Sequence, residues 1–97
     1  MSEKFTLEII SPDRQVIKIE TSEVIIPAYE GEIGILKDHI PLITFLRPGL
    51  IQIQGELDKK YFVEDGTVEF ANNNLLILTS TAKEIQELDK NLIDSII

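Results

Sequence analysis

Residues 24–53 read VIIPAYEGEIGILKDHIPLITFLRPGLIQI, and this stretch carries the main information about the fold. Short apolar runs alternate in it with turn-forming residues. The runs are long enough for β-strands and too short for helices; they cover residues 24–26, 33–36, 42–46 and 50–54. Proline, glycine and aspartate in the intervening segments favour tight turns. The stretch therefore predicts several short strands in succession.

The flanking sequence continues this pattern. Residues 4–9 and 15–20 alternate between apolar and polar side chains, and residues 75–78 form a fully apolar run. Asp65-Gly66 lies between two further runs and predicts a type I′ hairpin. Turn signals recur every 8–12 residues or so, which is typical of a β-sandwich or barrel. We expect a mainly β fold, a small antiparallel β-sandwich or flattened barrel of about 8–10 short strands.

A change of period after Ser80 predicts a helix at the end of the chain. Thr81 and Glu84 have the spacing of a capping box, in which each side chain bonds the other's backbone N–H. The apolar residues that follow lie on one helical face: Ile85, Leu88, Leu92 and Ile96. We therefore expect one short C-terminal helix over residues 83–97. This divides the chain into a β-sandwich domain, residues 1–80, and a helical segment, residues 81–97.

Composition excludes several classes of function. The chain has 97 residues and a formal net charge of −8, whereas nucleic-acid binding needs clustered Lys and Arg. It has no cysteine, so disulfides, thiolate zinc sites and cysteine catalysis are excluded. No apolar run approaches the ~20 residues that span a bilayer, so we expect no direct membrane insertion. Residues 1–10 are acidic and polar, unlike a signal peptide.

The residues that could carry chemistry do not form a recognisable catalytic motif. His39 is the single histidine, and it could pair with Thr44 or Ser11 only through the fold; nothing local resembles a nucleophile elbow. The segment around Gly31 and Gly34 is not a phosphate loop, because it has no Lys and Ser/Thr at the positions that such a loop requires. We therefore expect a non-enzyme without a cofactor. A hydrolase with His39 as base is the weakest alternative.

A stand-alone ligand- or metal-binding sandwich is the other alternative. Glu30, Glu32, Asp38 and His39 lie close together in sequence, and carboxylates and imidazole are metal ligands. Such ligands must converge in space. A solvated acidic loop explains the same residues more simply, so we expect no metal site.

The motif from Pro27 to Gly49 resembles the ε subunit family of F-type ATP synthase. The family pattern P-x-x-E-G-E-x-G-[IV]-L-x-x-H-x-P-L-[IL]-T-x-L-x-x-G is met throughout, while Lys37-Asp38 stands where the family usually has Pro-Gly. Residues 7–12, 63–70, 73–79 and 81–89 also resemble family segments, so the resemblance covers nearly the whole chain.

The resemblance implies a non-catalytic subunit of the rotor's central stalk, which links the γ subunit to the c-ring and couples proton flow to ATP synthesis. Such a complex sits on the cytoplasmic side of the bacterial inner membrane. By the resemblance, Glu30, Gly31, Glu32 and Ile33 would contact the polar loops of the c-ring. Ser11, His39 and Thr44 would lie toward γ.

The family commonly ends in a two-helix hairpin that can inhibit ATP hydrolysis and in some members binds ATP. The sequence given stops within or just after the first of these helices. We therefore expect this chain alone neither to inhibit hydrolysis strongly nor to bind ATP.

Overall fold

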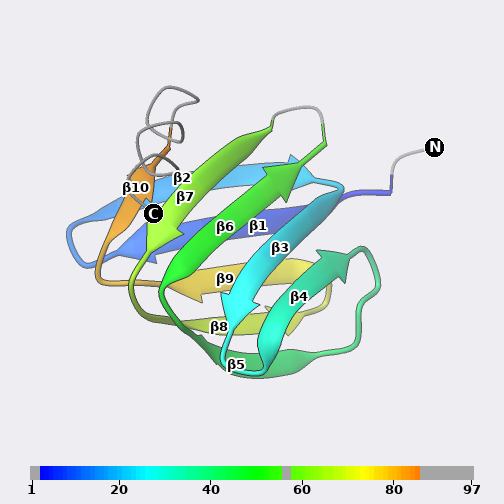
Figure 1. Cartoon of the computed structure of the whole chain (residues 1–97). Coiled ribbons are helices and arrows are strands. Elements are labelled where there is room, and N and C mark those ends of the chain that lie inside the picture. The colour runs from blue at the N-terminus through cyan, green and yellow to red at the C-terminus, as the bar shows by residue number, and fades with distance from the viewer. Residues whose placement is uncertain (1–2, 56–57, 86–97) are drawn as a thin grey trace.

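The fold consists of two layers of β-strands. The structure is a computed structural model and describes residues 3–55 and 58–85. The strands are β1 (Phe5–Ser11), β2 (Arg14–Thr21), β3 (Glu23–Ala28), β4 (Gly31–Leu36), β5 (Leu42–Leu46), β6 (Gly49–Gln54), β7 (Lys59–Val63), β8 (Gly66–Ala71), β9 (Asn74–Leu78) and β10 (Ala82–Glu84). In Figure 1, β10, β7, β6, β3 and β4 lie in front of β5, β8, β9, β1 and β2. The expected mainly β sandwich is confirmed.

The two layers belong to one continuous hydrogen-bonded path, in the order β10-β7-β6-β3-β5-β8-β9-β1-β2, with β4 paired to β3. The layers join where β3 meets β5, through the single pair Ala28 and Leu46. β1 and β9 run parallel, and the other strand pairs of the described chain are antiparallel. The result is a flattened, nearly closed barrel.

The core lies between the layers and is built by the alternation that the sequence predicts. In β1, every second side chain is buried, from Phe5 to Ile9. The rings of Phe5 and Phe70 meet edge to face with centroids 5.7 Å apart, a favourable aromatic geometry. The buried apolar residues are Phe5, Leu7, Ile9, Val24, Ile26, Ala28, Ile35, Leu46, Ile51, Ile53, Tyr61, Val63, Val68, Phe70, Leu75 and Ile77.

The Asp65-Gly66 segment is not a hairpin turn, so this prediction was wrong. It carries the chain from β7 in one layer to β8 in the other, and these two strands do not pair. Gly66 has φ +154°, whereas Asp65 is not among the residues with positive φ that a type I′ turn requires. A Cβ on Gly66 would lie 2.5 Å from the carbonyl oxygen of Leu78. The glycine is therefore needed for close approach of two backbones.

Gly66→Ala should destabilise the sandwich. The substitution forces an unfavourable φ and drives a methyl group into the backbone of β9, which together cost at least about 2 kcal/mol. Urea unfolding followed by circular dichroism measures the loss. Gly31→Ala is the matched control, because its φ is +123° but its Cβ would have no neighbour within 4 Å. Equal losses in the two variants would contradict the close-approach explanation.

The predicted start of the C-terminal helix is also wrong. Ala82–Glu84 form strand β10, which pairs antiparallel with β7. The N–H of Ile85 donates to the carbonyl of Lys60 at 2.8 Å, and Lys59 forms a 3.5 Å salt bridge with Glu84. Pairing along the edge of β7 thus outweighs the local helical pattern, as tertiary context often does. The remaining residues of the predicted helix, 86–97, lie outside the described residues.

Candidate interaction surface

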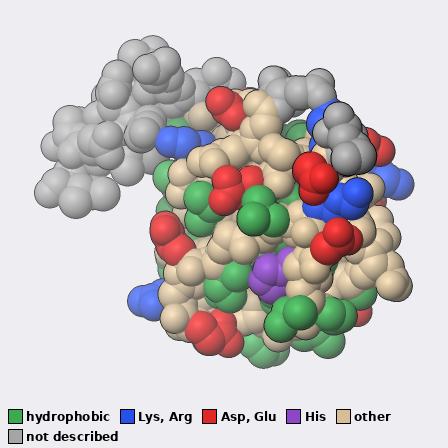
Figure 2. All heavy atoms as spheres, turned by 90° about the vertical axis from the view of Figure 1, so that its right-hand side faces the viewer, with side chains coloured by type: hydrophobic (Ala, Val, Ile, Leu, Met, Phe, Trp, Pro, Cys, Tyr) green, Lys and Arg blue, Asp and Glu red, His purple; other side chains and the backbone are tan. Residues whose placement is uncertain are grey.

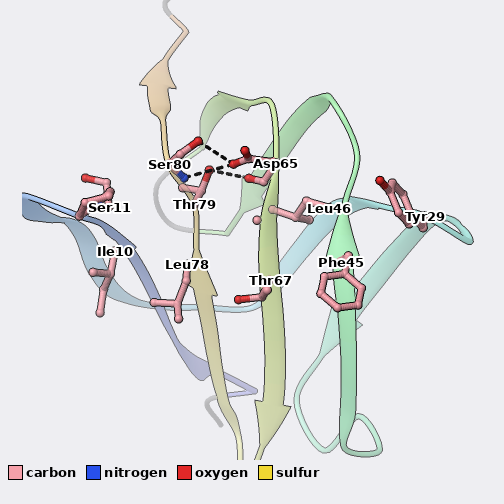
Figure 3. Close-up of a pocket in the computed structure, with 12 residues that line it drawn as sticks. Ile10, Ser11, Tyr29, Phe45, Leu46, Asp65, Thr67, Leu78, Thr79 and Ser80 are labelled. Atoms are coloured by element: carbon pink, nitrogen blue, oxygen red, sulfur yellow. Dashed lines mark hydrogen bonds between the residues drawn. The ribbon is translucent and has the colours of Figure 1, made fainter.

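An apolar row crosses the outer face of one layer. In β-strands, successive side chains point to opposite faces, so residues beside the buried ones point outward. The strand registers place Phe45 opposite Thr67, Thr67 opposite Leu78, and Leu78 beside Ile10. Figure 3 shows these four side chains next to one another across β5, β8, β9 and β1. Three of the four are large and hydrophobic.

This row forms the floor of an open groove of about 910 Å³. Tyr29 borders it beside β5 and is 66% exposed, while Phe45 is 57% and Leu78 is 45% exposed. Ile43, 77% exposed, extends the apolar surface along β5. A contiguous apolar patch of this kind on a small domain is typical of an interaction site. We call this surface, from Ile43 and Tyr29 to Ile10, the groove face.

Hydrogen bonds at one rim of the groove fix the segment that leads into β10. The Asp65 carboxylate accepts from the backbone N–H of Ser80 at 3.2 Å and from its hydroxyl at 2.7 Å. The Thr79 hydroxyl donates to the carbonyl of Asp65 at 2.6 Å. Hydrogen bonds to a carboxylate favour its charged form. The bonds from Ser80 therefore hold the pKa of Asp65 below its usual value of 3.8.

Asp65 should make stability depend on pH in the acid range. Because its pKa is lower in the folded than in the unfolded chain, its stabilising contribution is present above the unfolded pKa and is lost as pH falls through the folded pKa. Asp65→Asn should thus lower the melting temperature at pH 7, and the gap to the parent chain should narrow as pH falls below about 4. Thermal unfolding followed by circular dichroism checks this. A gap that stays constant down to pH 2 would contradict it.

The turn between β3 and β4 lies where the two layers join. Ala28 pairs with Gly31, so Tyr29 and Glu30 form a two-residue connection. The N–H of Tyr29 donates to the carbonyl of Phe45 at 3.1 Å. Glu30 Oε1 accepts a 2.8 Å hydrogen bond from Thr44 Oγ1. This turn is therefore attached to β5 by both backbone and side chain.

The four residues expected to contact the c-ring have different environments. Glu32 is exposed, whereas Ile33 is half-buried and packs against the core. Gly31 adopts φ +123°, a conformation that favours glycine. Glu30 is exposed but hydrogen-bonded to Thr44. The two acids therefore differ: the Glu30 carboxylate is bonded to Thr44, whereas Glu32 is exposed and has no bond to Thr44.

The three residues expected near γ do not form one cluster. Ser11 lines the groove at the end of β1. Thr44 is buried, 6% exposed, between the outward-facing Ile43 and Phe45. His39 lies at the opposite end of this layer, with its ring edge to face against Phe70 at 5.9 Å, and Phe70 packs on Phe5 at the start of β1. Thr44 therefore lies between two separated positions.

Figure 2 looks onto the right-hand side of Figure 1, where the histidine reaches the surface beside hydrophobic side chains. The backbone N–H of His39 donates to the carbonyl of Leu36 at 3.1 Å, and the ring Nδ1 lies 2.7 Å from the carbonyl oxygen of Ile40. Asp38, with φ +68°, exchanges two hydrogen bonds with the Asn73 side chain. Asp38 thus adopts the left-handed conformation, which aspartate tolerates more readily than most residues.

The geometry does not support the metal-binding or hydrolase alternatives. Glu30 precedes β4 and His39 follows it, and a six-residue strand is about 20 Å long. No three potential metal ligands gather anywhere in residues 3–55 and 58–85. The Thr44 hydroxyl is bonded to Glu30, and Ser11 lies at the far end from His39. Neither hydroxyl is placed beside the imidazole.

Sequence reasoning missed the groove face, although a signal for it is present. Residues 42–46, LITFL, are apolar on both sides of the strand, and residues 75–78 have no polar side chain at all. A strand with one face on the core and the other in water should alternate. Apolar residues on both faces of β5 and β9 therefore predict an apolar outer face, which the structure shows.

Comparison with known proteins identifies the family. Residues 4–85 match the family model described as the ATP synthase delta/epsilon chain β-sandwich domain. The chain belongs to this family. A relative from Pelagibacter ubique (strain HTCC1062) named ATP synthase epsilon chain is 48% identical over 99 residues, covering 100% of this chain and 76% of the relative. One of the same name from Dichelobacter nodosus is 38% identical, covering 96% and 66%.

Solved structures agree with the fold of this family member. A chain in the Euglena gracilis mitochondrial ATP synthase structure titled OSCP/F1/c-ring superposes with a TM-score of 0.84 at 21% identity. The match covers 99% of our chain and 62% of the Euglena chain, so our chain spans less than two thirds of it. A chain in the Tetrahymena thermophila central stalk/c-ring structure gives 0.71 at 16% identity, covering 84% and 66%. Within the described ranges, no helix has the length and apolarity needed to cross a membrane.

Proposed function

We propose that this chain is the non-catalytic ε subunit of the central stalk of a proton-translocating F-type ATP synthase. In this role it links the γ subunit to the c-ring and couples proton flow to ATP synthesis. It would work peripherally, on the cytoplasmic side of the bacterial inner membrane. The observation that carries the proposal is the family match over residues 4–85, combined with a large apolar groove on one layer of the sandwich.

The γ subunit would dock on the groove face. Tyr29 and Phe45 are exposed there. Aromatic side chains are enriched at protein interfaces, and tyrosine is one of the residues that most often dominate the binding energy. The apolar surface continues along β5 through Ile43 to Ile40, which is 74% exposed. It therefore runs between the separated positions of Ser11 and His39. Thr44 would support this interface from beneath.

The c-ring would contact the turn between β3 and β4 and the start of β4. Glu32 is exposed there, and it can pair with basic or polar groups on the loops of the ring. Gly31 keeps the backbone open, since nothing lies within 4 Å of where its Cβ would be. These contacts at the rim of an interface should contribute orientation and association rate more than affinity.

The experiment uses the cognate γ subunit and the detergent-solubilised c-ring, each mixed with this chain and run by size-exclusion chromatography. We expect stable co-elution with γ. Addition of γ to the c-ring should recruit the chain to the ring, and Glu32→Gln should weaken that recruitment without changing co-elution with γ. No co-elution with folded γ would contradict the proposed function. A Glu32→Gln chain recruited as well as the parent would contradict the c-ring assignment.

A further inference from the structure

Glu30 has an unusual position for an exposed acid. Its Oε1 accepts the 2.8 Å hydrogen bond from the hydroxyl of Thr44, whose side chain is buried at 6% exposure. Hydrogen bonds to an ionised acceptor are roughly twice as strong as those between neutral groups. The carboxylate is thus turned back against β5. Its neighbour two residues on, Glu32, has no such bond to β5 and is exposed.

The hydrogen bond between Glu30 and Thr44 lies next to the single residue pair that joins β3 to β5. Ala28 pairs with Leu46 there. On either side, Tyr29 N–H donates to the Phe45 carbonyl and Arg47 N–H donates to the Pro27 carbonyl at 2.9 Å. These backbone bonds hold the base of the turn. The bond between Glu30 and Thr44 is the side-chain contact that holds its tip.

Tyr29 is the groove residue adjacent to that tip in the sequence. It precedes Glu30 directly and stands at the side of the groove, next to Phe45, with two thirds of its side chain exposed. Ordering a loose loop on binding costs affinity, and a segment already held in its bound conformation avoids that cost. A turn held in one conformation therefore places the backbone that carries the Tyr29 ring before γ binds.

We propose, on the basis of the function proposed above, that Glu30 is a positioning residue for γ binding. Through Thr44 it fixes the tip of the β3–β4 turn, so that Tyr29 stands at the groove in the conformation that receives γ. The two neighbouring acids then have separate roles, with Glu30 serving the groove face and Glu32 facing the c-ring. The buried hydroxyl of Thr44 is the second half of the device and makes no contact with γ itself.

A double-mutant cycle on γ affinity tests this proposal. Glu30→Ala and Thr44→Val each remove one partner of the bond and should each weaken binding about tenfold. Because both remove the same interaction, the double variant should be no weaker than about twentyfold, far short of the hundredfold that independent effects would give. Glu30→Gln keeps an acceptor oxygen and should restore most of the affinity. Glu32→Ala is the matched control and should bind γ as the parent chain does.

Isothermal titration calorimetry gives the affinities, and amide hydrogen exchange of the free chain gives a readout independent of γ. Glu30→Ala should speed exchange at the Tyr29 amide while exchange at Leu7 in the core stays unchanged. The positioning role would be overturned if the double variant lost affinity by the product of the two single losses. It would also be overturned if Glu30→Ala left amide exchange at Tyr29 unchanged. If the parent chain and Glu30→Ala bind γ with equal affinity, this inference is overturned and the proposed function is not. A parent chain that fails to bind folded γ would overturn the proposed function together with it.

Discussion

Phe45→Asp should weaken binding of γ by a hundredfold or more, a loss of about 3 kcal/mol. The substitution removes an aromatic anchor from the β5 end of the apolar row and places a charge where the interface would exclude water. A charge buried without a partner is costly. Because Phe45 is 57% exposed in the chain alone, the variant should still fold. Isothermal titration calorimetry with γ measures the change.

Phe62→Asp is the matched control. Phe62 is also an exposed phenylalanine, 37% exposed, but it lies on β7 in the other layer. It should leave γ affinity within about threefold of the parent. Similar losses from both variants would mean that added negative charge, rather than the groove face, governs binding. No loss from Phe45→Asp would place γ elsewhere on the sandwich.

Phe70→Ala should be the most destabilising single truncation of the core, with a loss of about 3–5 kcal/mol. The ring is 1% exposed and contacts Phe5 and His39 edge to face, so its removal opens a cavity and ends two aromatic contacts. A domain of this size has a total stability of about 5–15 kcal/mol. The loss is therefore a large fraction of the total free energy of unfolding.

Urea unfolding at 25 °C measures this loss. Phe45→Ala is the control, since it removes a ring of the same size from the outer face of the same layer, and it should cost less than about 1 kcal/mol. Comparable losses at the two positions would mean that Phe70 is not the packing centre that its burial indicates.

The strands were predictable because local pattern and tertiary burial agree in them. In β1, the alternation of Phe5, Leu7 and Ile9 with polar residues is reproduced directly as alternating burial. Glycine signals at Gly31 and Gly49 also mark real starts of strands, whereas Pro27 and Gly34 lie within the paired strands β3 and β4. Period-2 patterning is a property of single strands, and it therefore survives whatever the strands pair with.

The two errors arose where pairing partners decide the structure. Asp65-Gly66 has the composition of a hairpin turn, but which strands are neighbours in a sandwich depends on closure of the whole path. Residues 82–84 have a helical pattern, yet the unpaired edge of β7 accepts them as a strand. A window of ten residues does not show whether a strand edge elsewhere in the fold is free to pair, or whether a turn connects two strands of the same layer or of different layers.

The candidate site was predictable in part. The family motif pointed to the turn at Glu30–Ile33 and to Ser11, His39 and Thr44, and whether these touch the c-ring and γ stays a prediction. The hydrogen bond between Glu30 and Thr44 joins a residue of the first set to one of the second. A contact between two positions 14 residues apart, one in a turn and the other on a strand, could not be inferred from spacing alone.

Thiol protection in the assembled ATP synthase tests the central claim most directly. The chain has no cysteine, so Thr67→Cys in the groove, Glu32→Cys at the ring-facing turn and Phe62→Cys on the other layer each provide one thiol in this subunit. Maleimide labelling rates are compared between the free chain and the assembled enzyme. We predict strong protection at positions 67 and 32 and little change at position 62. Labelling at 67 and 32 as fast as in the free chain would contradict the proposed place of this subunit between γ and the c-ring.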